Sequence, residues 1–230
     1  MKEKQNYTRY GGVSISYADG DASYSRGSGD NHSRAMNFYV TEMGNKGHYL
    51  DVVLRFHHID TNFKMFDENG KKIRGDMHNV GISLSSEYGR KKMIDDKGWY
   101  IEPQGQLTIG YLGGDNYTTS NGIAVRQGGI RSVLGRIGFN LGKDIDEKTN
   151  IYLKANLLHE FGGGYHAAMA DNSGSRIKID RSFKDTWVEY GIGAAIQTGT
   201  NNHVYLDFER SAGGDFKKDW SWNVGARWTF

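Results

Sequence analysis

The sequence has no cysteine and a single proline among its 230 residues. Without cysteine there is no disulfide framework, thiolate metal site or thiol nucleophile.

Long apolar runs and excess charge are also missing. No stretch approaches the roughly 20 apolar residues that a membrane helix needs, and the mean hydropathy is −0.67. The formal net charge is +2, from dispersed basic and acidic residues. The sequence therefore predicts no helical membrane span and no nucleic-acid partner.

The first residues, Met1 to Asn6, have no apolar segment of the kind found in a signal peptide. An exported chain needs such a segment to cross the inner membrane. If this protein is exported, we expect the sequence to be the C-terminal piece of a longer secreted precursor.

Glycine and aromatic residues are abundant: 32 Gly, 14 Tyr, 10 Phe and 5 Trp. Glycine at this level without a collagen repeat suits turns and close strand packing. Tyrosine and tryptophan are typical of the two interfaces of a membrane.

The C-terminal segment shows the clearest pattern. In steps of two, the apolar set is Trp220, Trp222, Val224, Ala226, Trp228 and Phe230, and polar residues and Gly225 lie between them. A period of two places the sets on opposite faces of a strand. An apolar face with aromatic ends is typical of an outer-membrane strand.

The same alternation of apolar and polar residues recurs in nine earlier segments. They begin near Gly11, Met36, Leu50, Val80, Trp99, Val133, Ile151, Val188 and Val204. The sequence thus predicts an all-β fold: an antiparallel transmembrane outer-membrane β-barrel with about ten strands in this chain.

The links between these segments alternate in length. Short or moderate turns are expected at Gly44–Gly47, Gly89–Gly98, Gly142–Thr149 and Gly199–Asn202, and long polar loops at Asp19–Ser33, Asp60–Asp76, Gly113–Gly129 and Gly162–Lys184. Bacterial barrels have short periplasmic turns and long extracellular loops. A soluble β-sandwich or lipocalin-like barrel also alternates, but needs no such difference between its ends.

Several short motifs occur in a characteristic order. They are Gly27-Ser28-Gly29, Tyr49-Leu50-Asp51, Gly98 to Gln104, Tyr117 to Gly122, Gly135 to Gly138, His159 to Gly162, Asp185 to Gly193 and Arg227 to Phe230. In this order the chain resembles the C-terminal β-barrel translocator domain of type Va autotransporters, over nearly its whole length.

The resemblance implies a barrel, residues 1–230, in the Gram-negative outer membrane that anchors an N-terminal passenger and enables its export. Its partners would be membrane lipid, the barrel-assembly machinery and its own passenger; we expect a monomer with a periplasmic C-terminus and no cofactor or metal. The assembly signal would comprise Trp220, Trp222, Val224, Trp228 and Phe230.

The alternation places a set of charged residues on the inner face. The predicted pore-lining residues are Asp51, Arg55, Glu87, Glu102, Arg136, Lys154, Glu160, Glu189, Asp207, Glu209 and Arg227. They could hydrate a peptide inside the pore, or rigidify the wall as cross-strand ion pairs.

The chain departs from the family in length. The family barrel has about twelve strands and a helix in its pore, so we expect the first two strands, the pore helix, the passenger and the signal peptide to be absent from residues 1–230. An unclosed sheet would leave backbone groups unpaired in lipid.

Enzymatic alternatives rest on two groups of residues. Glu160, Glu189 and Asp207 could assist self-cleavage of a passenger, but the linker to be cut is not in this sequence. An omptin-like protease could use His57, His58, Asp60 and Asp115 at the extracellular rim to activate water; a passive pore or small adhesin barrel is a third alternative. Asp144, Asp146 and Glu147 lack the ligand spacing of a calcium loop.

Overall fold

The computed structural model describes residues 7–199, 202–215 and 217–228. Every regular element in this part of the chain is a strand. The strands are β1 (Tyr7–Tyr24), β2 (Gly27–Gly44), β3 (His48–Phe66), β4 (Lys72–Arg90), β5 (Lys92–Met93), β6 (Trp99–Leu112), β7 (Asn116–Thr118), β8 (Ala124–Gln127), β9 (Ile130–Asp144), β10 (Thr149–Glu160), β11 (Gly164–Ala170), β12 (Arg176–Ser182), β13 (Asp185–Gln197), β14 (Asn202–Ala212) and β15 (Ser221–Trp228). These residues include no helix long and apolar enough to span a bilayer.

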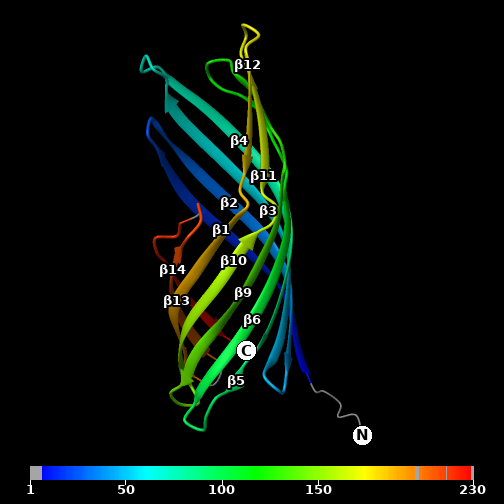
Figure 1. Ribbon diagram of the computed structural model, residues 1–230, viewed down its shortest axis with the longest axis vertical. Helices are drawn as coiled ribbons and strands as arrows, with labels where there is room; N and C mark the ends of the chain where they lie inside the picture. The colour runs from blue at the N-terminus through cyan, green and yellow to red at the C-terminus, as the bar shows by residue number, and fades with distance from the viewer. Residues whose placement is uncertain (1–6, 200–201, 216, 229–230) are drawn as a thin grey trace.

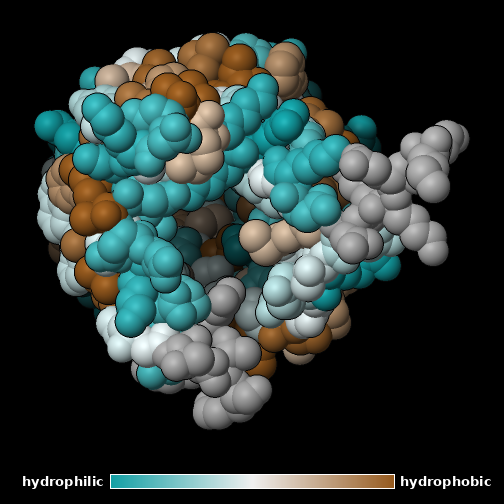
Figure 2. Space-filling model, turned by 90° about the horizontal axis from the view of Figure 1, so that it is seen from below, coloured by the Kyte–Doolittle hydropathy of each residue, from teal (hydrophilic) through white to brown (hydrophobic). Residues whose placement is uncertain are grey.

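One antiparallel sheet forms the body of the protein. Ten strands follow one another in the order β1-β2-β3-β4-β6-β9-β10-β13-β14-β15, and β5 pairs with the start of β6. The sheet curls around a hollow (Figures 1 and 2). The antiparallel barrel-type sheet with about ten strands is therefore confirmed. β1 and β15 end this order, and no ladder joins them among the described residues.

The two ends of the sheet differ. At the end where Figure 1 shows β5, which we call the turn end, short connections join β2 to β3 and β9 to β10. At the opposite end, which we call the hairpin end, β7, β8, β11 and β12 form a separate four-stranded sheet in the order β12-β11-β8-β7.

The prediction of long polar loops at the hairpin end was wrong, because most of these residues form strands. Residues 19–33 belong to β1 and β2, which continue to a two-residue turn, and residues 60–76 extend β3 and β4 to Phe66 and Lys72. The other two expected loops contain the four strands of the small sheet. Backbone hydrogen bonds continue a ladder whether or not one face is apolar, so the strands extend beyond the apolar pattern.

The apolar residues lie on the outside of the curled sheet. Ile15 is 80% exposed, and Leu84, Leu153, Ile192 and Val224 are also exposed. Figure 2 shows hydrophobic surface around the outside of the ring and an opening at its centre. A water-soluble protein would bury this surface, so the medium around it must be apolar.

Conventional core residues are few. In the described part of the chain, the buried hydrophobic residues are Tyr100, Val125, Leu158 and Ala167. The fold is therefore held by its ladder and by contacts along the inner face.

Glycine and tyrosine are paired across the sheet. The directly opposed pairs are Gly12 and Tyr39, Tyr49 and Gly89, Tyr100 and Gly142, Tyr152 and Gly193, and Tyr205 and Gly225. At each glycine, an added Cβ would lie within 3.0 Å of the opposing tyrosine side chain. Each ring thus occupies the space that the missing side chain leaves, which explains part of the glycine content.

Candidate functional site

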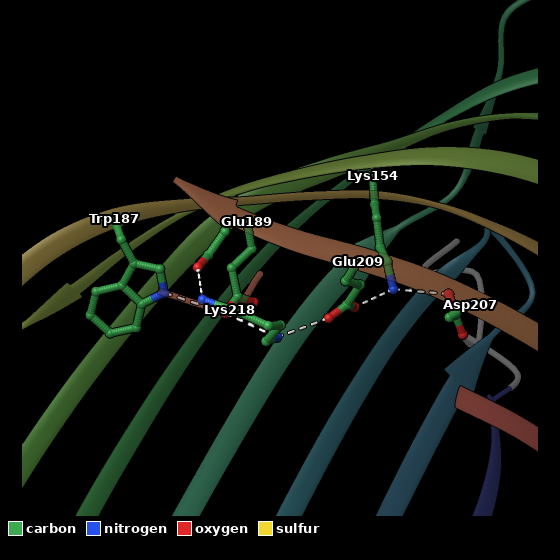
Figure 3. A network of polar contacts seen from close by, with 7 residues as sticks. Lys154, Trp187, Glu189, Asp207, Glu209 and Lys218 are labelled. Atoms are coloured by element: carbon green, nitrogen blue, oxygen red, sulfur yellow. Dashed lines mark hydrogen bonds and ion pairs between the residues drawn. The ribbon is translucent and has the colours of Figure 1, made fainter. Parts of the chain in front are cut away.

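The inner face carries a network of ion pairs that we call the lysine network: Lys154, Glu189, Asp207, Glu209 and Lys218 (Figure 3). The Lys154 Nζ lies 2.9 Å from an Asp207 carboxylate oxygen and also pairs with Glu209. The Lys154 side chain is only 14% exposed. The two carboxylates neutralise the Lys154 ammonium, whose burial without a partner would be energetically costly.

The geometry of this network depends on glycines in the strand between its members. Lys154 on β10 is opposite Gly191 on β13, which is opposite Glu209 on β14. A Cβ on Gly191 would clash with the backbone of β14. In the next row, the Tyr152 hydroxyl lies over Gly193 and donates to Asp207 at 2.7 Å. Polar groups therefore meet across an intervening strand.

Lys218 joins the network from the connection between β14 and β15. Its Nζ lies 3.1 Å from Glu209 and 3.2 Å from Glu189. Burial alone lowers the pKa of Lys218, but the carboxylates of Glu209 and Glu189 outweigh it and raise that pKa above its ordinary value. The Trp187 indole donates to Glu189 at 3.3 Å. No sequence pattern marks Lys218, because a lysine in a polar connection has no alternation that assigns it to one face of a strand.

A second polar cluster lies across β3, β4 and β9. Arg136 donates to Glu87 at 2.6 Å, across the intervening β6, and the Tyr49 hydroxyl donates to the other Glu87 oxygen at 2.7 Å. The Nε of Arg136 is buried without a hydrogen-bond partner.

The remaining predicted pore-lining residues make shorter-range contacts. Thr41 donates to Asp51, Arg55 donates to Asn37 at 2.6 Å, and Glu102 accepts from Gln104 and Asn140. The side chain of Arg227 lies outside the described part of the structure.

The three predicted self-cleavage acids are engaged in different places. Glu160 accepts from the Ser132 hydroxyl at 2.5 Å and from the backbone N–H groups of Val133 and Gly162. Glu189 and Asp207 belong to the lysine network. Glu160 thus holds a strand end, whereas the other two carboxylates neutralise lysines.

The predicted assembly-signal residues lie at the sheet's final edge. Trp222 and Val224 are on β15, and Trp220 immediately precedes it. Trp222 is 61% exposed, and Trp220 and Val224 are similarly open. The side chain of Trp228 and all of Phe230 lie outside the described residues.

The protease-like residues do not form one site. His57 contacts the position of Gly81 on the inner face. His58 and Asp60 are an even number of residues from the exposed Phe56, so they lie with it on the outer face. Asp115 accepts from the backbone N–H of His78 at 2.7 Å, and the structure adds His78 to His58 and Asp60. The sheet therefore separates His57 from the other imidazoles.

The acidic turn at Asp144–Glu147 is held by its own chain. Lys91 pairs with Asp144 at 2.8 Å. The backbone N–H of Lys148 donates to Asp146 and lowers the pKa of that carboxyl. These contacts are those of a solvated turn.

An antiparallel sheet that curls around a charged interior and exposes apolar side chains outward defines an outer-membrane β-barrel protein. The sequence profile of the autotransporter beta-domain matches residues 4–209. The chain belongs to this family, whose members are translocator barrels of the Gram-negative outer membrane. The predicted resemblance is confirmed.

Individual relatives support this family membership. Pertactin autotransporter of Bordetella parapertussis is 32% identical over 220 residues, which are 93% of this chain and 23% of the relative. BrkA autotransporter of Bordetella pertussis is 26% identical over 96% of this chain and 22% of its own length. The chain thus spans about a quarter of the length of these curated relatives.

Solved structures match the whole sheet. The crystal structure of the beta domain of Bordetella BrkA has a TM-score of 0.76 and 25% identity, covering 96% of this chain and 84% of that one. The translocator domain of NalP from Neisseria meningitidis has a TM-score of 0.71 at 10% identity, covering 100% of this chain and 76% of that one. The second likeness concerns the fold alone.

Proposed function

We propose that residues 1–230 act as one translocator unit that anchors an N-terminal passenger and enables its export to the bacterial surface. The observation that carries this proposal is the division of the sheet into an apolar exterior and an ion-paired, polar interior. Such a wall is stable in lipid and presents hydrogen-bonding groups to a peptide inside it.

The charged inner residues have a mainly structural role in this proposal. Lys154 and Lys218 connect carboxylates on β13 and β14 and fill the interior beside the wall. Hydrated charges on the same face would also favour an extended or helical polar segment over an apolar one. The wall thus serves as pore lining without a dedicated binding site.

Orientation follows from the two ends. Short turns suit the periplasm and longer structures suit the cell surface, so we place the C-terminus in the periplasm and the small four-stranded sheet outside the cell. Trp220, Trp222, Val224, Trp228 and Phe230 would form the signal read by the barrel-assembly machinery. The exposed Trp222 and Val224 support this role because an assembly factor could reach them at the sheet edge.

The unit would perform no chemistry of its own and would function as a monomer in lipid. The acids Glu160, Glu189 and Asp207 support this view because each already holds a backbone group or a lysine.

Surface display by the full-length gene product tests the proposal. We expect the segment before residue 1 to be accessible to added protease on intact cells, and the C-terminal domain to run as a heat-modifiable species from the outer membrane. Trp222→Ser should reduce both signals, whereas Ile177→Ser, on β12 outside the large sheet, should not. An inserted domain with a fully protected upstream segment would contradict the export role.

A further inference from the structure

Three potential metal ligands converge on the outer face of β3 and β4. The His58 Nε2 lies 2.9 Å and the His78 Nδ1 lies 2.7 Å from the same oxygen of Asp60. All three donor atoms lie within 4.8 Å of one another. Both imidazoles thus already direct a ring nitrogen toward one point.

The strands preorganise this arrangement. Asp60 and His78 are directly opposed in a ladder that runs without a break from His48 and Arg90 to Phe66 and Lys72. His58 precedes Asp60 by two residues, so it lies on the same face. The two imidazole rings are stacked, with centroids 6.4 Å apart and planes 15° apart. Little chain entropy remains to be lost when the donors bind a common ion.

The surroundings are open and largely acidic. His58, Asp60 and His78 side chains are 44%, 23% and 63% exposed, which leaves room for water on an ion. The charges of Asp115 and Asp76 also act on His78. Arg34 is opposite His58, and His32, opposite Asp60, is held by Asp19 at 2.5 Å. His32 is therefore engaged elsewhere, and water would complete the coordination.

We propose that His58, Asp60 and His78 form a binding site for a divalent transition metal ion, Zn²⁺ above all, on the outer face of the barrel. Two imidazoles and a carboxylate with open positions are a donor set that suits zinc. Zinc binds nitrogen and oxygen donors at about 2.0–2.2 Å, and the exposure of the two imidazole side chains leaves them free to adjust to these distances. Hard ions such as Ca²⁺ and Mg²⁺ prefer all-oxygen sites and should bind poorly.

Titration of the folded, detergent-solubilised protein with Zn²⁺ tests the site. We expect one Zn²⁺ per chain, undisturbed by excess Mg²⁺ or Ca²⁺. Losing a hydrogen-bond partner of a metal ligand alone weakens binding about 10- to 100-fold, so His58→Ala and His78→Ala should each weaken it by about ten-fold or more. Both imidazole side chains are exposed, so these variants should keep the native fold, and heat-modifiable mobility verifies that they do.

The matched control is His166→Ala. His166 also contacts an aspartate, Asp180, at 2.5 Å on an exposed hairpin, but within the described part of the chain no second imidazole joins this pair in a three-ligand group. Zn²⁺ affinity should be unchanged in this variant. With Cu²⁺ as a spectroscopic probe, electron paramagnetic resonance should show coupling to two nitrogens in the parent protein and to fewer in His78→Ala. No saturable Zn²⁺ binding, or equal losses in all three variants, would overturn the proposal.

Discussion

Gly142→Ala should destabilise the barrel by forcing Tyr100 from its place. A Cβ at residue 142 would lie well under 3.0 Å from the ring and hydroxyl of Tyr100, which is 5% exposed. The Lys91 ammonium lies 3.9 Å from the centroid of this ring and also pairs with Asp144. The ring therefore cannot move without disturbing a neighbouring contact.

The magnitude follows from these contacts. Overpacking of this kind costs about 1–3 kcal/mol, and loss of the cation–π contact adds about 0.5–2 kcal/mol. Replacing a strand glycine by alanine recovers about 0.5–1 kcal/mol of chain entropy. We expect a net loss of about 1–4 kcal/mol in the free energy of unfolding.

Denaturant unfolding in detergent micelles, followed by tryptophan fluorescence and heat-modifiable mobility, measures this loss. Gly110→Ala is the control, because this glycine is on the same inward face of β6 as Tyr100 and its nearest neighbour, the Cβ of Ser83, would be 3.4 Å away. In a double-mutant cycle, Tyr100→Ala should remove most of the cost of Gly142→Ala. Equal stabilities of Gly142→Ala and Gly110→Ala would refute the reasoning.

Three further perturbations test other parts of the structure. Lys154→Met should lower the free energy of unfolding by about 1–3 kcal/mol, because Asp207 and Glu209 lose their shared cation; an unchanged denaturation midpoint would contradict this. Leu84→Arg should cost about 2–4 kcal/mol in lipid, as measured by unfolding from liposomes, whereas Ile177→Arg on β12 should cost little. Hydrogen bonds from Ser173 and Ser175 lower the pKa of Asp171 in the hairpin turn between β11 and β12. The stability that ionised Asp171 adds to this turn is therefore complete above the ordinary carboxyl pKa of about 4 and is lost as pH falls through the lowered value. The protection factors of the turn's amides, which are exchange rates relative to the intrinsic rate at the same pH, should fall on acidification in the parent but not in Asp171→Ala.

The outward-facing residues could be predicted from sequence because a single physical condition, contact with lipid, selects them. Each apolar residue in a strand meets lipid and its neighbour does not, so Leu153 and Lys154 are assigned to opposite faces by parity alone. The number of strands in the main path follows from the same rule.

The hairpin end could not be predicted in this way. Beyond the lipid, both faces of a strand meet water, and the period of two in hydropathy disappears although the ladder continues. Residues 19–33 and 60–76 therefore read as loops while their backbone remains paired.

Contacts between residues on different strands could not be predicted either, because they depend on the register with which the strands pair. Lys154 meets Glu209 because both oppose Gly191, and Asp60 meets His78 because β3 and β4 align over their whole length. Nothing in the local sequence specifies which residue of one strand is opposite a residue of the next. The role of Lys218 depends in addition on the path of a connection.

The pairing of tyrosines with glycines has a consequence for how the barrel is built. A shift of two residues between β6 and β9 would keep every side chain on its correct face, yet would place Tyr100 against Asn140 or Asp144 instead of Gly142. Hydropathy cannot distinguish such a misaligned hairpin from the native one, but steric fit can. The five Tyr–Gly pairs occur at alternate interfaces along the sheet, so at each of these interfaces the native alignment fits and one slipped by two residues does not.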